Sequence, residues 1–192
     1  MKQKRDRSQT RNDLLDAADR VVRRDGASTL TLDAAAREAG LSKGGVLYHF
    51  PTKNALIGAM IERICDRFER EIEAHLDILP ESPGRWTRAY LDAAFDEDSW
   101  NDDLESAGNA GLLAAIAASP AMLDPLRERY TRWQSRIEVD GIDPAIGTLI
   151  RMTVDGLWMA DLLGLEPPDT ATRILLRKHL IDLIERGKET AP

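Results

Sequence analysis

The chain has 192 residues, a formal net charge of −7 and a pI near 5.1, values that argue against a protein coating nucleic acid with its whole surface. Its length suits one domain or two small ones. The single cysteine, Cys65, excludes an intrachain disulfide. Because no secretory signal or membrane span is recognisable, we expect a cytoplasmic protein with no membrane association.

The charge is unevenly distributed along the chain. Residues 1–53 contain 11 Lys and Arg against 7 Asp and Glu, whereas residues 54–192 contain 15 against 26. This asymmetry predicts a basic N-terminal domain, residues 1–53, followed by a larger acidic domain, residues 54–192.

Apolar residues recur at helical spacing nearly throughout, and no alternating β-branched run indicates a sheet. The pattern predicts an all-α protein. We expect about nine helices, near residues 8–25, 32–39, 43–50, 52–78, 85–95, 103–118, from 120 or 125 to 138, 144–163 and 169–186.

The second and third of these helices meet at a three-residue turn, Gly40–Ser42. Gly40 can adopt the left-handed conformation that ends a helix, and Ser42 can cap the next one. Alanines on the first helix allow the two to cross closely. This layout is typical of a helix-turn-helix, although an ordinary helical hairpin would share it.

Two features of this segment break local rules. The pair Gly44-Gly45 costs about 1 kcal/mol per glycine relative to alanine inside a helix. Lys53 stands in the first turn of a helix, where the helix dipole disfavours a cation. Close approach to another surface at Gly44 would explain the glycine pair. A phosphate held by Lys53 and the Thr52 hydroxyl would explain the lysine.

The run GLSKGGVLYHFPTK, residues 40–53, closely resembles the turn, recognition helix and following helix start of TetR-type transcriptional repressors, and the resemblance extends over about residues 10–58. It implies an all-α homodimer with a three-helix DNA-binding head and a larger helical body that binds an effector. By this similarity the DNA contacts are Thr31, Ser42, Lys43, Gly44, Gly45, Tyr48, His49, Thr52 and Lys53. Leu47 departs from the family pattern, in which tyrosine is frequent.

A basic N-terminal arm precedes the head. It contains Lys2, Lys4, Arg5, Arg7 and Arg11. Such an arm either follows the DNA backbone and minor groove or remains a solvated tail.

The body offers large, adaptable apolar side chains and a few polar ones as candidate effector contacts. The candidates are Asn109, Met122, Trp133, Met152, Asp155, Trp158 and Met159. The tryptophans and methionines are equally interpretable as ordinary core. Asp155 pairs either with a cationic ligand or with Arg151, one helical turn earlier.

The helices at residues 145–163 and 170–186 are apolar on more than one face. A single core needs only one apolar stripe, so the second face indicates a partner, most simply another copy of the chain.

No catalytic constellation, metal site or cofactor motif is recognisable, so we expect neither an enzyme nor a cofactor. The acidic run at residues 96–105 lacks the EF-hand spacing and reads as a solvated surface. Cys65 reads as a buried, inert thiol rather than a sensor.

The function that these observations predict is a ligand-responsive repressor bound to a near-palindromic double-stranded operator, cytoplasmic and released by a small molecule. An activator would have the same sequence features. A helical binding protein or enzyme whose head no longer binds DNA is the alternative.

Overall fold

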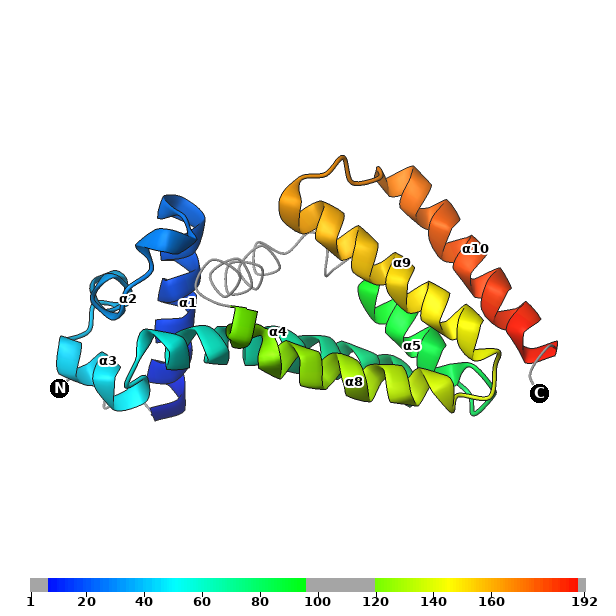
Figure 1. Ribbon diagram of the computed structural model, residues 1–192, viewed down its shortest axis with the longest axis horizontal. Helices are drawn as coiled ribbons and strands as arrows, with labels where there is room; N and C mark the ends of the chain where they lie inside the picture. Colours follow the sequence, from blue (N-terminus) through cyan, green and yellow to red (C-terminus); the bar gives the residue numbers. More distant parts are fainter. Residues whose placement is uncertain (1–6, 96–119, 190–192) are drawn as a thin grey trace. The chain divides into compact units, whose positions relative to one another are not determined.

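A computed structural model describes residues 7–95 and 120–189, in which helices are joined by turns and loops and no strand occurs (Figure 1). The helices are α1 (Arg7–Asp25), α2 (Leu32–Ala39), α3 (Lys43–His49), α4 (Lys53–Ile78), α5 (Arg85–Ala94), α8 (Asp124–Glu138), α9 (Pro144–Leu163) and α10 (Thr170–Glu189), with short 3₁₀ turns η1 (Ala27–Thr29) and η2 (Pro120–Leu123). The all-α prediction is confirmed. None of the described helices is long and apolar enough to cross a membrane.

Three sequence-based expectations lie outside the described residues. They are the helix at 103–118, Asn109 and the acidic run at 96–105. The start of the basic arm lies outside them as well, but Arg7 and Arg11 belong to α1.

The chain divides into two compact units. Among the described residues, the first comprises 7–65 and 120–127, and the second comprises 66–95 and 128–189. The long helix α4 begins in the first unit and ends in the second.

In the first unit, α1 presents its apolar stripe to the core, where α2 packs against both α1 and α3. Leu14, Leu15 and Val46 are completely buried, and each such burial contributes about 1.5–3 kcal/mol. This stripe follows the helical period that the sequence shows.

A buried ion pair joins α1 to the start of α4 in this unit. Arg63 bonds Asp19, which is 1% exposed, and reaches Asp16 at 2.6 Å. Burial raises the pKa of Asp19 from 3.8 to about 7, outweighing the opposing attraction of Arg63.

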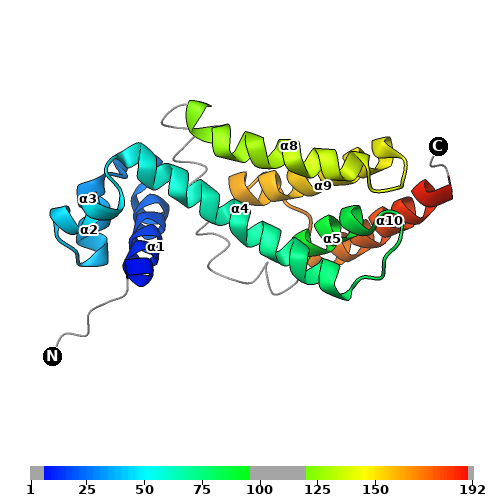
Figure 2. The same cartoon turned by 90° about the horizontal axis from the view of Figure 1, so that it is seen from below.

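In the second unit, α5 packs against both α9 and α10, and these two helices pack against each other (Figures 1 and 2). Asp143 caps α9 by accepting from the Ala145 N–H at 2.8 Å, Pro144 occupies its first position, and Gly164 ends it with φ 64°. The predicted range of this helix, 144–163, is confirmed, and these residues are its start and stop signals.

One predicted helix end is wrong. We expected the last helix to end near residue 186, but α10 continues to Glu189. Gly187 is buried against Ile142 and Ile146, where a Cβ would lie 3.3–3.5 Å from their side chains, so packing keeps the glycine inside the helix.

Candidate functional site

The turn between α2 and α3 has the geometry that its sequence predicts. Gly40 adopts the left-handed conformation, with φ 67° and ψ 31°, and the Leu41 N–H donates to the Ala36 carbonyl at 2.9 Å. This closure satisfies carbonyls at the end of α2 and directs the chain immediately into α3.

Three residues predicted to contact phosphates share one structural role. Thr31, Ser42 and Thr52 precede α2, α3 and α4, and each side-chain oxygen accepts from the backbone N–H three residues on, at 3.0, 3.2 and 3.0 Å. All three are exposed. Because each hydroxyl uses a lone pair for the cap, its O–H remains a donor for an anion.

The α3 surface is open. Tyr48 is 65% exposed, and a Cβ added at Gly44 would meet no atom within 4 Å. Lys43 is held by Asp33 of α2, with Nζ 3.2 Å from the carboxylate, in a pair exposed on both sides. A strongly charged ligand such as a phosphate would compete for this lysine.

The remaining predicted DNA contacts flank this surface. Gly45 lies over the Ser42 hydroxyl, 3.5 Å from where its Cβ would be, and His49 is half-buried at the last position of α3. Lys53 is half-buried at the first position of α4, directly after the capping Thr52. The nine predicted DNA contacts thus lie on α3, at the first position of α4 and at the caps that precede α2, α3 and α4.

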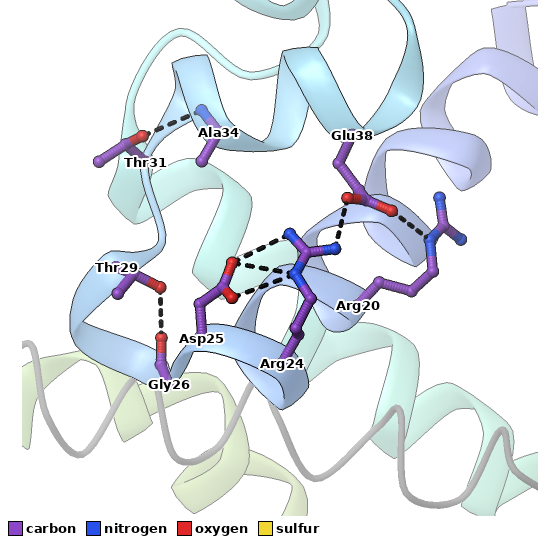
Figure 3. Close-up of polar contacts among 8 residues, drawn as sticks. All are labelled: Arg20, Arg24, Asp25, Gly26, Thr29, Thr31, Ala34 and Glu38. Atoms are coloured by element: carbon purple, nitrogen blue, oxygen red, sulfur yellow. Dashed lines mark hydrogen bonds and ion pairs between the residues drawn. The ribbon is translucent and has the colours of Figure 1, made fainter.

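A charged cluster that sequence reasoning missed connects α1 to α2. Glu38 accepts from Arg20 and Arg24 at 2.9 Å each, and Arg24 also bonds Asp25 (Figure 3). The two arginine bonds lower the pKa of Glu38. The cluster is exposed and stabilises the fold little, but it links α1 to α2, the first helix of the helix-turn-helix.

The contact that Arg7 makes was also not predictable from the residues next to it in the sequence. Its guanidinium carbon lies 5.0 Å from the centre of the Tyr48 ring. Arg11, one turn later, lies 5.3 Å from the centre of the Phe50 ring. Both arginines therefore face the end of α3 and the residue that follows it.

Among the candidate effector residues, Trp133 is buried in an aromatic cluster of the second unit. Its Nε1 donates to Glu69 at 3.1 Å, and its ring lies edge-on to Phe68 and Tyr90. This burial fits the core interpretation that the sequence left open.

Asp155 lies at the polar centre of the same unit. It accepts from Tyr90 and Tyr130 hydroxyls at 2.8 and 3.1 Å and pairs with Arg151 at 2.7 Å. Burial raises the pKa of Asp155, against the lowering effect of all three partners. The structure therefore contains the pairing of Asp155 with Arg151. The hydrogen bonds from the two tyrosines, on α5 and α8, had no local signal in the sequence.

The other nominated residues are more accessible. Met122 is half-buried in the first unit, and Trp158 is half-buried in the second. Met152 is 61% and Met159 is 37% exposed on α9.

These two methionines belong to an exposed apolar stripe along α9. Leu149, Met152, Gly156, Met159 and Leu163 follow a three-four spacing that places them on one face. On α10, Ile174 and Leu175 are also exposed.

Within the part of the chain that the structure describes, no three His, Cys, Asp or Glu side chains are grouped as metal ligands would be.

Comparison with known proteins gives consistent results for both parts of the chain. Residues 14–60 match the family model for bacterial regulatory proteins of the tetR family, and residues 84–185 match the model for a tetracyclin repressor-like C-terminal domain. The HTH-type transcriptional regulator BetI of Escherichia coli O17:K52:H18 is 25% identical over 185 residues, covering 89% of this chain and 91% of BetI.

Solved structures share the fold. A putative transcriptional regulator from Pseudomonas aeruginosa PAO1 superposes with a TM-score of 0.75 at 19% identity, covering 96% of this chain and 94% of that one. The multidrug binding protein EbrR complexed with malachite green gives a TM-score of 0.62 at 26% identity, covering 90% and 96%.

Proposed function

Because this chain belongs to the TetR family of bacterial regulatory proteins, we propose that it represses transcription from a near-palindromic operator and leaves it when a small molecule binds. The family assignment makes it a ligand-responsive, DNA-binding transcriptional regulator rather than an enzyme. Regulators of this family are dimers. The proposal adds the direction of control, the symmetry of the operator and the residues involved.

The proposed DNA-binding domain comprises residues 1–53, and the proposed effector and dimerisation domain comprises residues 54–192. The observation that carries the DNA-binding proposal is the shared role of Thr31, Ser42 and Thr52. Three exposed hydroxyls at three helix starts, around the open α3, form a set of phosphate donors.

Within this set we assign base contacts to the exposed side of α3, including Lys43, Tyr48 and His49, with Gly44 and Gly45 allowing close approach. In a dimer, two α3 helices would enter successive major grooves about 34–36 Å apart.

The test is a salt titration of operator binding by Lys53→Ala. Each lost lysine–phosphate contact lowers the slope of log affinity against log salt by about 0.9. We expect weaker binding to every duplex and a flatter salt dependence, measured by fluorescence anisotropy with DNA from upstream of the gene.

Arg136→Ala is the matched control for this experiment. Arg136 is exposed in the last turn of α8, so the variant removes one positive charge from the second unit. It should retain the wild-type slope. A Lys53→Ala protein with unchanged affinity and slope would contradict the phosphate contact, and a wild-type protein with no sequence-specific binding would contradict the function.

For the effector we propose a site in the second unit near Trp133, Asp155 and Trp158. The support is chemical, because an aromatic cluster beside a buried carboxylate can hold an apolar or cationic molecule. The related EbrR structure contains malachite green. Native mass spectrometry of the purified protein would detect an effector retained from the cell.

Asn109 and Met122 remain proposed effector contacts as well. The exposure of Met152 and Met159 on the α9 stripe favours a place for them in the dimer interface, which we propose lies on α9 and α10. Because α4 contains both Lys53 and Glu69, a shift of this helix would pass from the effector region to the DNA-binding head; such coupling is typically worth about 1–3 kcal/mol.

A further inference from the structure

Tyr48 is the most exposed aromatic side chain of the proposed DNA-binding surface. Two groups frame its ring. His49 meets it edge-on, with ring centroids 5.2 Å apart, and the Arg7 guanidinium lies 5.0 Å from its centre. Arg7 comes from the first turn of α1, more than forty positions before Tyr48 in the chain.

The contact matters because an exposed tyrosine otherwise samples several rotamers. Selecting one of them when DNA arrives reduces the affinity. A guanidinium over the ring is attracted by the electron-rich face and favours one orientation beforehand. Tyr48 is 65% exposed, so much of its side chain remains accessible to DNA.

We propose that Arg7 is a positioning residue for DNA recognition, which holds the Tyr48 ring in the orientation that reads the operator. The inference rests on the proposed function. It assigns Arg7 a role in sequence selectivity, beyond that of one more positive charge near the phosphates.

The chain supplies its own control for the charge. Arg11 lies one turn after Arg7 on the same helix and makes the same type of contact, at 5.3 Å, with Phe50. Phe50 is 2% exposed and is fixed by the core without help. Removing Arg11 therefore removes an equal charge from the same face without freeing a recognition side chain.

The experiment is a double-mutant cycle of Arg7→Gln and Tyr48→Ala, with Arg11→Gln as the control. Duplexes selected by the wild-type protein from a random-sequence pool, and single-base variants of them, serve as probes in anisotropy titrations. Circular dichroism and thermal unfolding establish that each variant is folded.

We expect Arg7→Gln to weaken binding to the selected duplex by about two- to fivefold per protomer, the size of an exposed cation–π contact. It should reduce base preference at the position where Tyr48→Ala reduces it. In the Tyr48→Ala background, Arg7→Gln should have little further effect on base preference and should cause only the uniform loss of affinity that Arg11→Gln causes. Arg11→Gln should weaken all duplexes alike and add to Tyr48→Ala.

Two outcomes would overturn the inference. In the first, Arg7→Gln behaves as Arg11→Gln does, with a uniform, additive loss and a lowered salt slope, which makes Arg7 a phosphate contact only. In the second, Arg7→Gln leaves the affinity unchanged. Either result leaves the proposed function intact, whereas failure of the wild-type protein to select any duplex overturns the function itself.

Discussion

Asp19 combines deep burial with a charged partner. Its carboxylate is 1% exposed and bonds Arg63, while Oδ1 has no hydrogen-bond partner in the structure. The nearby charges come from Asp16 and Arg23 on its own helix and from Arg63 on α4. Burial dominates these and favours the protonated acid, so the folded protein holds this proton far more tightly than the unfolded chain does.

This tight proton binding predicts a pH-dependent stability. The pKa of Asp19 is 3.8 when unfolded and about 7 when folded. The stabilisation that the protonated Asp19 adds to the free energy of unfolding is therefore fully present below pH 4. It is lost as the pH rises to about 7, at up to about 1.4 kcal/mol per pH unit. Asp19→Asn should flatten the free energy of unfolding across this range, measured by urea denaturation.

Asp16→Asn is the matched variant for that experiment. Asp16 pairs with the same arginine but has a half-exposed side chain. Most of the wild-type slope should survive in Asp16→Asn, although loss of the Asp16 charge lowers the pKa of Asp19 and narrows the pH range over which stability changes. An equal slope in wild type and Asp19→Asn would show that Asp19 is charged in the folded state throughout.

The cap at Ser42 was predicted because a capping hydroxyl depends on its local sequence alone, whereas Thr31 and Thr52 were named as phosphate contacts and not as caps. Asp19 and the Tyr90–Asp155–Tyr130 network were not predicted. Their roles arise where different helices meet, and one sequence contains no signal for contacts between elements so far apart in the chain.

At the scale of elements, α3 is unusual because it contains adjacent glycines within seven residues. A Cβ added at Gly44 would meet no atom of another described segment within 4 Å, so no packing among the described residues requires a glycine there. A requirement from outside the chain, close approach of DNA, explains its presence better than any contact within the fold.

Gly44→Ala should accordingly have opposite effects on stability and on function. Helix propensity predicts a gain of about 1 kcal/mol in unfolding free energy. The added methyl group should weaken operator binding. Thermal unfolding and anisotropy on the same samples measure both quantities.

Gly58→Ala provides the comparison, because Gly58 lies inside α4 and its Cβ would also meet nothing within 4 Å. It should gain stability similarly without losing operator affinity. If Gly44→Ala binds the operator as well as wild type, α3 does not approach DNA at this position.

Helix positions were predicted closely where local signals are strong. Thr31 and Gly40 fix both ends of α2, and Asp143 and Gly164 do so for α9. The end of α10 lies three residues beyond the expected residue 186, and the burial of Gly187 against Ile142 and Ile146 is a tertiary effect that local sequence does not show.

At the scale of the whole molecule, the exposed stripe of α9 is the feature that a single copy of the chain leaves unexplained. Leu149 and Met152 are more than half exposed. Gly156 lies between these residues and Met159, and its Cβ would meet nothing within 4 Å in the chain. A small residue in the middle of an apolar face allows a partner helix to approach closely.

Gly156→Arg tests this face without disturbing the protomer. The new side chain has open space, and arginine favours the helix over glycine, so the isolated protomer should be at least as stable as wild type. In a dimer formed through α9 the arginine would be buried against apolar residues, so we expect dissociation to monomers in sedimentation experiments. Operator affinity should fall with it, because each half-site would then be bound separately.

Ser135→Arg introduces the same side chain at an exposed position of α8 in the same unit and should remain dimeric. If Gly156→Arg stays a dimer with full operator affinity, the interface lies elsewhere. If it becomes monomeric but binds the operator as tightly as wild type, dimerisation does not contribute to DNA recognition. The two measurements together thus separate the position of the interface from its role in binding.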